Sequence, residues 1–169
     1  MDACTECGFR YDLAGAEQAG SSIVGGAREF GALLLSPHDR VTERPAPAVW
    51  SPLEYGCHLR DVLLVQRERV LLARRSPHPA AEPMGRDERV EHDGYADQAP
   101  ADVARQLGDA AQLFAHVLAR LGTADWERTI VYNYPERRDR TLRWLACHTL
   151  HEVRHHLLDA HRQQASGSG

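Results

Sequence analysis

The sequence has 169 residues, of which 43% are hydrophobic and 26% charged, with a formal net charge of −4. These values are typical of one soluble globular domain, and the net charge gives no general attraction to nucleic acid. No apolar run is long enough to span a membrane, and the amino terminus lacks the layout of a signal peptide, so we expect a cytoplasmic protein. All 20 basic residues are arginine, which excludes a lysine Schiff base or a lysine general base.

A Cys-x-x-Cys-Gly motif opens the chain at Cys4 and Cys7. It resembles one half of a zinc ribbon, in which the glycine lets backbone amides turn toward the thiolates. No second Cys-x-x-Cys follows, so a site of four cysteines cannot form within one chain. The pair could recruit a distant histidine or a second subunit, or stay a reduced, redox-sensitive pair without metal, which is the interpretation we favour. We treat residues 1–11 as an N-terminal extension.

Four segments show the apolar spacing of helices: residues 12–35, 52–75, 102–121 and a last one that begins near residue 142. Ser51, Pro52 and Glu54 give the second segment an N-cap, a proline at its first position and a capping box. No stretch alternates convincingly with period two. The sequence therefore predicts an all-α four-helix bundle over residues 12–163, followed by a flexible tail at 164–169.

Two connections of the predicted bundle are long. Residues 76–100, between the second and third helices, are rich in proline, glycine and acidic residues, and we expect an irregular loop of the kind that often covers a site. Residues 126–140 form a second connector before the last helix.

Residues 143–159 of the last helix carry four of the ten histidines: His148, His151, His155 and His156. His151 and His155 are four residues apart, so their rings lie on one side of a helix and can converge on a single cation. Histidines hydrogen-bonded to backbone or carboxylate are the competing interpretation, and the motif alone favours it. His58 lies in the apolar stripe of the second helix and could supply a third imidazole.

Two segments, residues 50–62 and 151–156, together resemble the DinB/YfiT superfamily. Residues 134–138, 141–142 and 148–152 are similar to the branch that includes mycothiol-dependent maleylpyruvate isomerases and mycothiol S-transferases. The resemblance covers most of the chain from about residue 12, whereas the Cys-x-x-Cys motif lies outside the superfamily pattern. The superfamily is named after a DNA-damage-inducible gene product, and this name does not indicate a nucleic-acid partner.

The resemblance implies a four-helix bundle, often a homodimer, that holds zinc or nickel through three histidines. By position these are His58, His151 and His155. It also implies an enzyme that activates a low-molecular-weight thiol such as mycothiol for attack on an electrophilic small molecule. Three neutral imidazoles would leave a coordination position open, as in catalytic sites.

Three neighbouring residues could support such a centre. His148 lies one turn before His151 and could relay protons or act as a spare ligand, while Asp61 and Glu152 could each orient a ligand ring. We expect His156 at the surface. Two other functions remain open from the sequence: hydrolysis by metal-bound hydroxide without a thiol, and a non-catalytic metal-binding bundle of the stress response.

Overall fold

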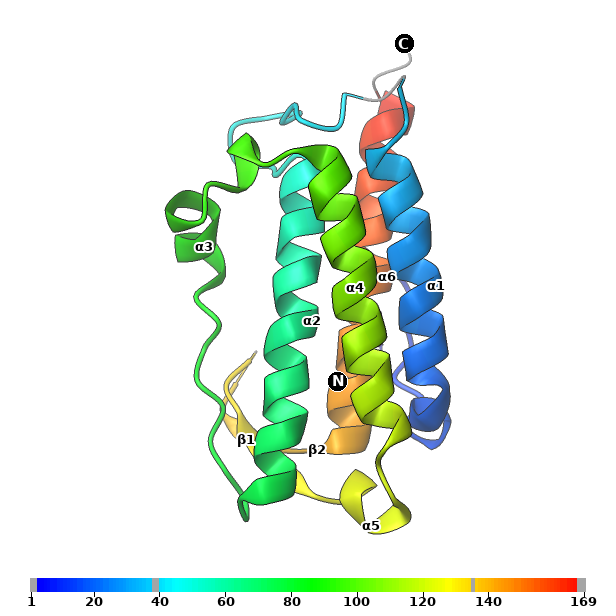
Figure 1. Cartoon of the computed structure of the whole chain (residues 1–169), viewed down its shortest axis with the longest axis vertical. Helices are drawn as coiled ribbons and strands as arrows, with labels where there is room; N and C mark the ends of the chain where they lie inside the picture. Colours follow the sequence, from blue (N-terminus) through cyan, green and yellow to red (C-terminus); the bar gives the residue numbers. More distant parts are fainter. Residues whose placement is uncertain (1–2, 38–39, 135, 167–169) are drawn as a thin grey trace.

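The computed structural model describes residues 3–37, 40–134 and 136–166. Its main elements are four long helices, which form the predicted four-helix bundle (Figure 1). A short 3-10 helix, η1 (Ala14–Gln18), leads into α1 (Ala19–Leu34), and the other long helices are α2 (Pro52–Arg75), α4 (Pro100–Ala119) and α6 (Leu142–Ser166). None of the described helices is long and apolar enough to cross a membrane.

The helices of the bundle are not arranged in simple chain order. α1 packs against α4 and α6, and α2 packs against the same two helices, so α1 and α2 lie across a diagonal. α2 and α4 run in the same direction, because the connection between them returns along the outside of the bundle (Figure 1). A long crossover of this kind allows parallel neighbours in a helix bundle. As a result, α2 lies beside α6, the helix that carries most of the candidate ligands.

The long connections contain more regular structure than the sequence indicates. Residues 76–100 include α3 (Arg86–His92) and the 3-10 turn η2 (Tyr95–Asp97). After α5 (Thr123–Trp126), the strands β1 (Thr129–Tyr132) and β2 (Arg138–Thr141) pair in antiparallel register. The sequence analysis gave residues 126–140 only as a connector and did not indicate these two strands. Each strand has only four residues, and only β1 alternates between buried and half-buried positions, which is too short a pattern to detect in the sequence.

The start of α2 and the end of α6 each test a prediction made from the sequence. The capping box at the start of α2 is confirmed: the Glu54 amide donates to Ser51 Oγ at 3.2 Å and the Ser51 amide donates to Glu54 Oε2 at 2.8 Å. At the other end of the chain, α6 continues to Ser166. Residues 164–166 of the expected tail are therefore helical, and 167–169 lie outside the described residues.

Two adjacent glycines in α1 differ sharply in what surrounds them. A Cβ added at Gly26 would lie 2.6 Å from Cγ1 of Val153, a fully buried residue of α6, whereas a Cβ at Gly25 would meet nothing within 4 Å. Valine is stiff at χ1, so its methyl group cannot easily move aside. Gly26 therefore sets how closely α1 approaches α6.

We expect Gly26→Ala to lower the free energy of unfolding by about 1–3 kcal/mol through overpacking. The matched variant Gly25→Ala should raise it by about 0.5–1 kcal/mol, because alanine is the better helix former. Urea unfolding of the two variants beside the wild type measures both changes. Two variants of equal stability would contradict the described contact between α1 and α6.

Candidate metal centre

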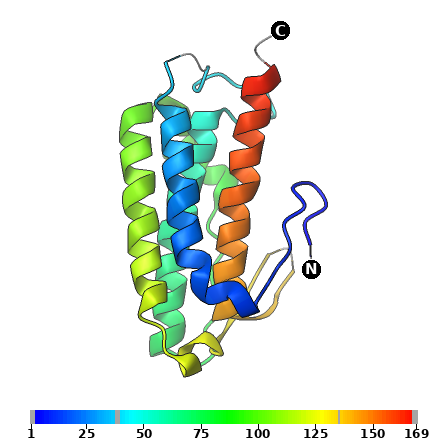
Figure 2. The ribbon, with the colours of Figure 1, turned by 90° about the vertical axis from the view of Figure 1, so that its right-hand side faces the viewer.

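The polar side of α6 faces two other parts of the molecule. One is α2, which packs along it, and the other is the N-terminal extension, which lies beside α6 (Figure 2). Histidine and glutamate side chains fill both contacts. We take the contact with α2 first because it contains the predicted ligand His58.

The His58 imidazole is buried and lacks hydrogen bonds. The residue is 2% exposed, and neither ring nitrogen has a hydrogen-bond partner. The Trp50 ring covers it at a centroid distance of 5.3 Å. A buried polar group without a partner costs free energy, so such a side chain in a native fold calls for a ligand that the protein atoms do not supply.

Glu152 and His156 of α6 face this imidazole. Glu152 Oε2 lies 3.9 Å from His58 Nε2 and 3.6 Å from His156 Nε2, and one ligand atom from each of the three residues lies within 4.8 Å of the others. A tetrahedral ion with zinc–nitrogen and zinc–oxygen bonds needs donor atoms about 3.3–3.5 Å apart. The two separations from Glu152 Oε2 are a few tenths of an ångström longer than this, so the three side chains can close on a divalent cation by moving inward.

The charges of this group also suit a cation. Burial lowers the pKa of His58, which keeps the ring neutral and able to bind a metal at pH 7. Burial acts to raise the pKa of Glu152, but the surrounding imidazoles of His151, His156 and His58 hold it well below its usual value. The carboxylate is therefore anionic. Two histidines and one glutamate with a fourth position open are a known ligand set of catalytic zinc sites.

Asp159 orients the second imidazole of the group. Its Oδ2 lies 3.3 Å from His156 Nδ1 and 3.5 Å from His155 Nε2. A carboxylate that accepts from one ring nitrogen leaves the other nitrogen free to bind metal, and such outer partners fix the ring of a ligating histidine. His156 Nε2 is thereby directed toward Glu152. The sequence analysis did not single out Asp159.

The structure divides the three histidines that the sequence assigned to one ion. In the described part of the chain His58 does not group with His151 and His155, which turn toward the N-terminal extension. Neighbouring positions on a helix point about 100° apart, so the pair 151/155 and the pair 152/156 face different partners. The set of three histidines stays a prediction from the sequence, while the geometry favours His58 with Glu152 and His156.

His156 is a candidate ligand that the sequence analysis did not name. It was expected at the surface, but its side chain is only 15% exposed and stacks on Tyr55 with ring centroids 4.9 Å apart. A signal was present, because Glu152 and His156 are also four residues apart. The sequence analysis considered only histidines as ligands, so it did not consider a pair made of Glu152 and His156.

His148 lies behind Glu152. Its Nε2 is 3.8 Å from Glu152 Oε1, and its Nδ1 is 3.0 Å from the Tyr11 hydroxyl. The same hydroxyl lies 3.2 Å from His151 Nδ1, so it can donate to one ring and accept from the other. His148 thus contacts the carboxylate oxygen that faces away from His58. Tyr11, which the sequence did not indicate, brings the N-terminal extension into the same polar cluster.

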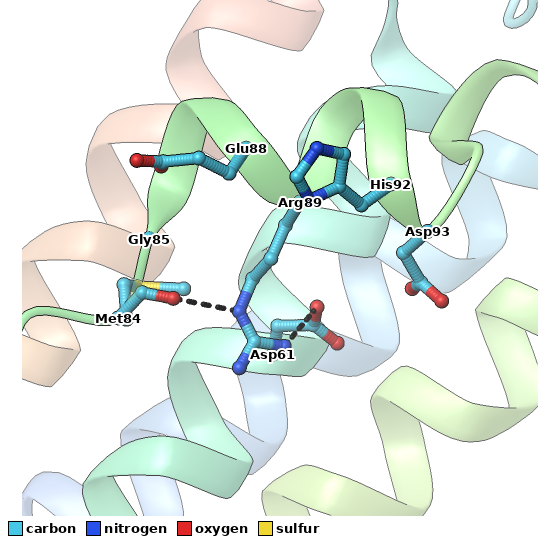
Figure 3. Close-up of a pocket in the computed structure, with 7 residues that line it drawn as sticks. All are labelled: Asp61, Met84, Gly85, Glu88, Arg89, His92 and Asp93. Atoms are coloured by element: carbon cyan, nitrogen blue, oxygen red, sulfur yellow. Dashed lines mark hydrogen bonds and ion pairs between the residues drawn. The ribbon is translucent and has the colours of Figure 1, made fainter.

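Asp61 has a different role from the one expected. Its carboxylate accepts hydrogen bonds from Arg60 Nε at 2.8 Å, Tyr95 Oη at 2.7 Å and Arg89 Nη1 at 3.0 Å. Figure 3 shows the contact with Arg89. These donors fasten α3 and η2 onto α2, so the carboxylate is occupied and does not orient a metal-ligating ring.

A surface hollow of about 430 Å³ lies next to Asp61. It is lined by Asp61, Met84, Gly85, Glu88, Arg89, His92 and Asp93 (Figure 3). None of the three candidate ligands lines it. We therefore regard this hollow as the edge of the 76–100 connection and not as the entrance to the metal centre.

Comparisons with known proteins agree with this fold. A family model described as the DinB superfamily matches residues 30–160. The solved structure of YfiT from Bacillus subtilis, described as a probable metal-dependent hydrolase with an unusual four-helix bundle topology, is similar with a TM-score of 0.68. That similarity covers 86% of this chain and 87% of the YfiT chain at 16% sequence identity. No curated protein sequence matches the chain significantly. The matched residues include all three candidate ligands and exclude Cys4 and Cys7.

The burial of His148 predicts a dependence of stability on pH. Burial lowers the pKa of His148 to about 4, whereas an unfolded histidine titrates near about 6.5. Between these values the unfolded chain binds a proton that the folded chain does not, so stability is lost as the pH falls.

We expect this group alone to destabilise the metal-free protein by about 2 kcal/mol between pH 7 and pH 5. Urea unfolding of the wild type and of His148→Gln at both pH values measures the contribution, and the variant should lose less stability on acidification. An imidazole NMR signal of His148 that titrates near pH 6.5 would contradict the prediction.

Proposed function

The chain belongs to the DinB superfamily, and on that premise we propose that it is a metal-dependent enzyme whose divalent ion is held by His58, Glu152 and His156. The observation that carries the proposal is the buried His58 imidazole, which has no hydrogen-bond partner and faces a carboxylate and a second imidazole. The description of YfiT as a probable metal-dependent hydrolase supports the same class of activity.

The ligand set favours zinc, with nickel as the alternative. A divalent cation held by three protein ligands would lower the pKa of a bound water or thiol and so provide a nucleophile near pH 7. The chain's own residues prepare the site for this. Glu152 supplies a negative charge, His58 stays neutral through burial, and Asp159 orients His156.

Two reactions fit such a centre. Attack by water on an ester, amide or related bond is hydrolysis, which the description of YfiT supports. Attack by a low-molecular-weight thiol such as mycothiol on an electrophilic carbon is S-transfer or isomerisation, which the resemblance of residues 134–142 to the mycothiol branch supports. The side chains of Glu152 and His156 keep 20% and 15% of their surface exposed, so a small molecule can approach the site. That access favours catalysis over a purely structural role for this metal.

We also propose that the enzyme works in the cytoplasm as a homodimer on a small molecule and not on nucleic acid. The resemblance to the superfamily supports the dimer, and the net charge of −4 supports the absence of a nucleic-acid partner. Light scattering should give a mass of twice 18.9 kDa. A mass equal to that of one chain would exclude the dimer.

Metal content tests the ligands directly. We expect His58→Gln to lose one equivalent of zinc or nickel relative to the wild type, because the two ligands left on α6 bind too weakly to retain it. Elemental analysis of protein purified without chelators measures the content. The matched control is His161→Gln, which changes an exposed histidine paired with Glu29 and should keep the wild-type content. Equal metal contents in the two variants would overturn the proposed centre.

Activity with and without thiols separates the two reactions. The metal-loaded protein is assayed against a panel of esters, amides, epoxides and alkyl halides, alone and with added mycothiol. Turnover that requires the thiol identifies a transferase, and turnover without it identifies a hydrolase. In either case His58→Gln should reduce turnover to the background rate. A fully loaded protein with no turnover on the panel, whose metal never exchanges its water, would support the non-catalytic alternative.

A further inference from the structure

The N-terminal extension folds into a tight turn around its two cysteines. The Cys4 amide donates to the Phe9 carbonyl at 2.8 Å, and the Gly8 amide donates to the Cys4 carbonyl at 2.9 Å. Gly8 has a φ of +72°, which glycine adopts without strain. The nearby backbone amides of Cys7 and Glu6 lower the pKa of the Cys4 thiol, while burial acts to raise it. A turn that aims backbone amides at a cysteine sulfur stabilises a thiolate, the form in which cysteine binds metals.

This turn docks on α6 through aromatic contacts. The Phe9 ring is buried and its centroid lies 5.3 Å from that of the His151 ring. The Arg154 guanidinium lies over the Phe9 ring, 5.6 Å from its centroid. The Tyr11 hydroxyl adds the hydrogen bond to His151 described above. These contacts hold the cysteines against the helix positions that carry His151 and His155.

Four ligand atoms meet at this contact. Cys4, Cys7, His151 and His155 each offer one donor atom, and all four atoms lie within 4.8 Å of one another. Cys4 Sγ is 3.7 Å from His155 Nδ1. A tetrahedral zinc ion with standard zinc–sulfur and zinc–nitrogen bonds places these two atom types about 3.5 Å apart. In the described part of the chain this is the one group with four such ligands.

Each imidazole has one nitrogen held by the protein and one left for an ion. His155 Nε2 lies 3.3 Å from Glu6 Oε2 and 3.5 Å from Asp159 Oδ2, which leaves Nδ1 facing Cys4. His151 Nδ1 is engaged by Tyr11, and its Nε2 is buried without a hydrogen-bond partner. This division of the two ring nitrogens is the usual arrangement of metal-ligating histidines.

We propose that Cys4, Cys7, His151 and His155 form a second, closed zinc site that fastens the N-terminal extension to α6. Two thiolates and two neutral imidazoles balance the charge of the ion and fill a tetrahedral shell, which is the pattern of structural zinc. The site completes the half zinc ribbon with two histidines of a helix instead of a second cysteine pair. It is separate from the His58 centre and positions Tyr11 next to His148.

A disulfide between Cys4 and Cys7 is the competing arrangement. Both cysteines are free thiols in the structure. A disulfide would leave His151 Nε2 buried and unpartnered, whereas a zinc ion would satisfy that nitrogen. The geometry of the histidines therefore favours the metal.

Cobalt substitution tests this site independently of the His58 centre, because a thiolate ligand gives a sulfur-to-cobalt charge-transfer band that nitrogen and oxygen ligands do not. The reduced full-length protein is stripped of metal and titrated with Co²⁺, followed by Zn²⁺. We expect an intense near-ultraviolet band and strong visible bands of tetrahedral cobalt in the wild type, both abolished by stoichiometric zinc. The matched variants are the double variant Cys4→Ser/Cys7→Ser, which removes both thiolates and should lose the thiolate band, and Cys147→Ser, which alters a buried cysteine outside the group and should keep it.

The outcomes distinguish the two proposed sites. His58→Gln should keep the thiolate band while losing one equivalent of zinc, and Cys4→Ser/Cys7→Ser should lose the band while keeping metal at His58. Folded wild type without a thiolate–cobalt band, or a Cys4→Ser/Cys7→Ser variant that retains it, would overturn the second site. Should the double variant fail to fold, the wild-type spectrum alone decides.

Discussion

The carboxylate of Glu152 lies among four imidazoles in the half-buried polar interior between α6, α2 and the N-terminal extension. Oε1 is near His148 and His151, and Oε2 is near His58 and His156, all at 3.6–3.9 Å. Because the surrounding rings hold its pKa well below the usual value, the group is a fixed negative charge. A charge in this position stabilises a cation beside His58, and it compensates the partial positive charge of the ring N–H groups that face it.

The long crossover from α2 to α4 makes this arrangement possible. It lets α2 run antiparallel to α6 and directly beside it, so the first turns of α2 meet the second half of α6 (Figure 1). The buried Asp61 carboxylate, with Arg60, Arg89 and Tyr95, anchors the crossover to the same helix. His58 of α2 thus lies at the candidate metal centre, while Asp61 and Arg60 of the same helix hold the crossover from α2 to α4 in place. Polar networks with every donor and acceptor paired give a single, well-defined arrangement of this kind.

The N-terminal extension adds a second set of constraints to α6. The residues matched by the superfamily begin at residue 30, so Cys4, Cys7 and Tyr11 lie outside that common region. The Tyr11 hydroxyl hydrogen-bonds with His148 and His151, and Asp159 contacts both His155 and His156. The two proposed ions would therefore share α6 as a scaffold and Asp159 as an orienting carboxylate. Loss of the zinc at Cys4 would act on the first centre only through these contacts.

Local patterns in the sequence were sufficient for much of this protein. They determined the helix at Pro52–Arg75 with its capping box, the last helix with its histidines, the four-helix class and the resemblance to the superfamily. Helix periodicity and capping depend on residues within a few positions of each other, so a single sequence contains them. The two strands were missed because four residues are too few to show a local alternating pattern.

Only the tertiary structure decided which side chains meet. The pairs 151/155 and 152/156 have the same spacing, and the rotation of α6 against α2 selects Glu152 and His156 to face His58. The contact of Cys4 with His155 joins residues 151 positions apart, and no local pattern encodes it. The orientation of a helix about its own axis is set by the packing of its neighbours, and the sequence of that helix alone does not specify it.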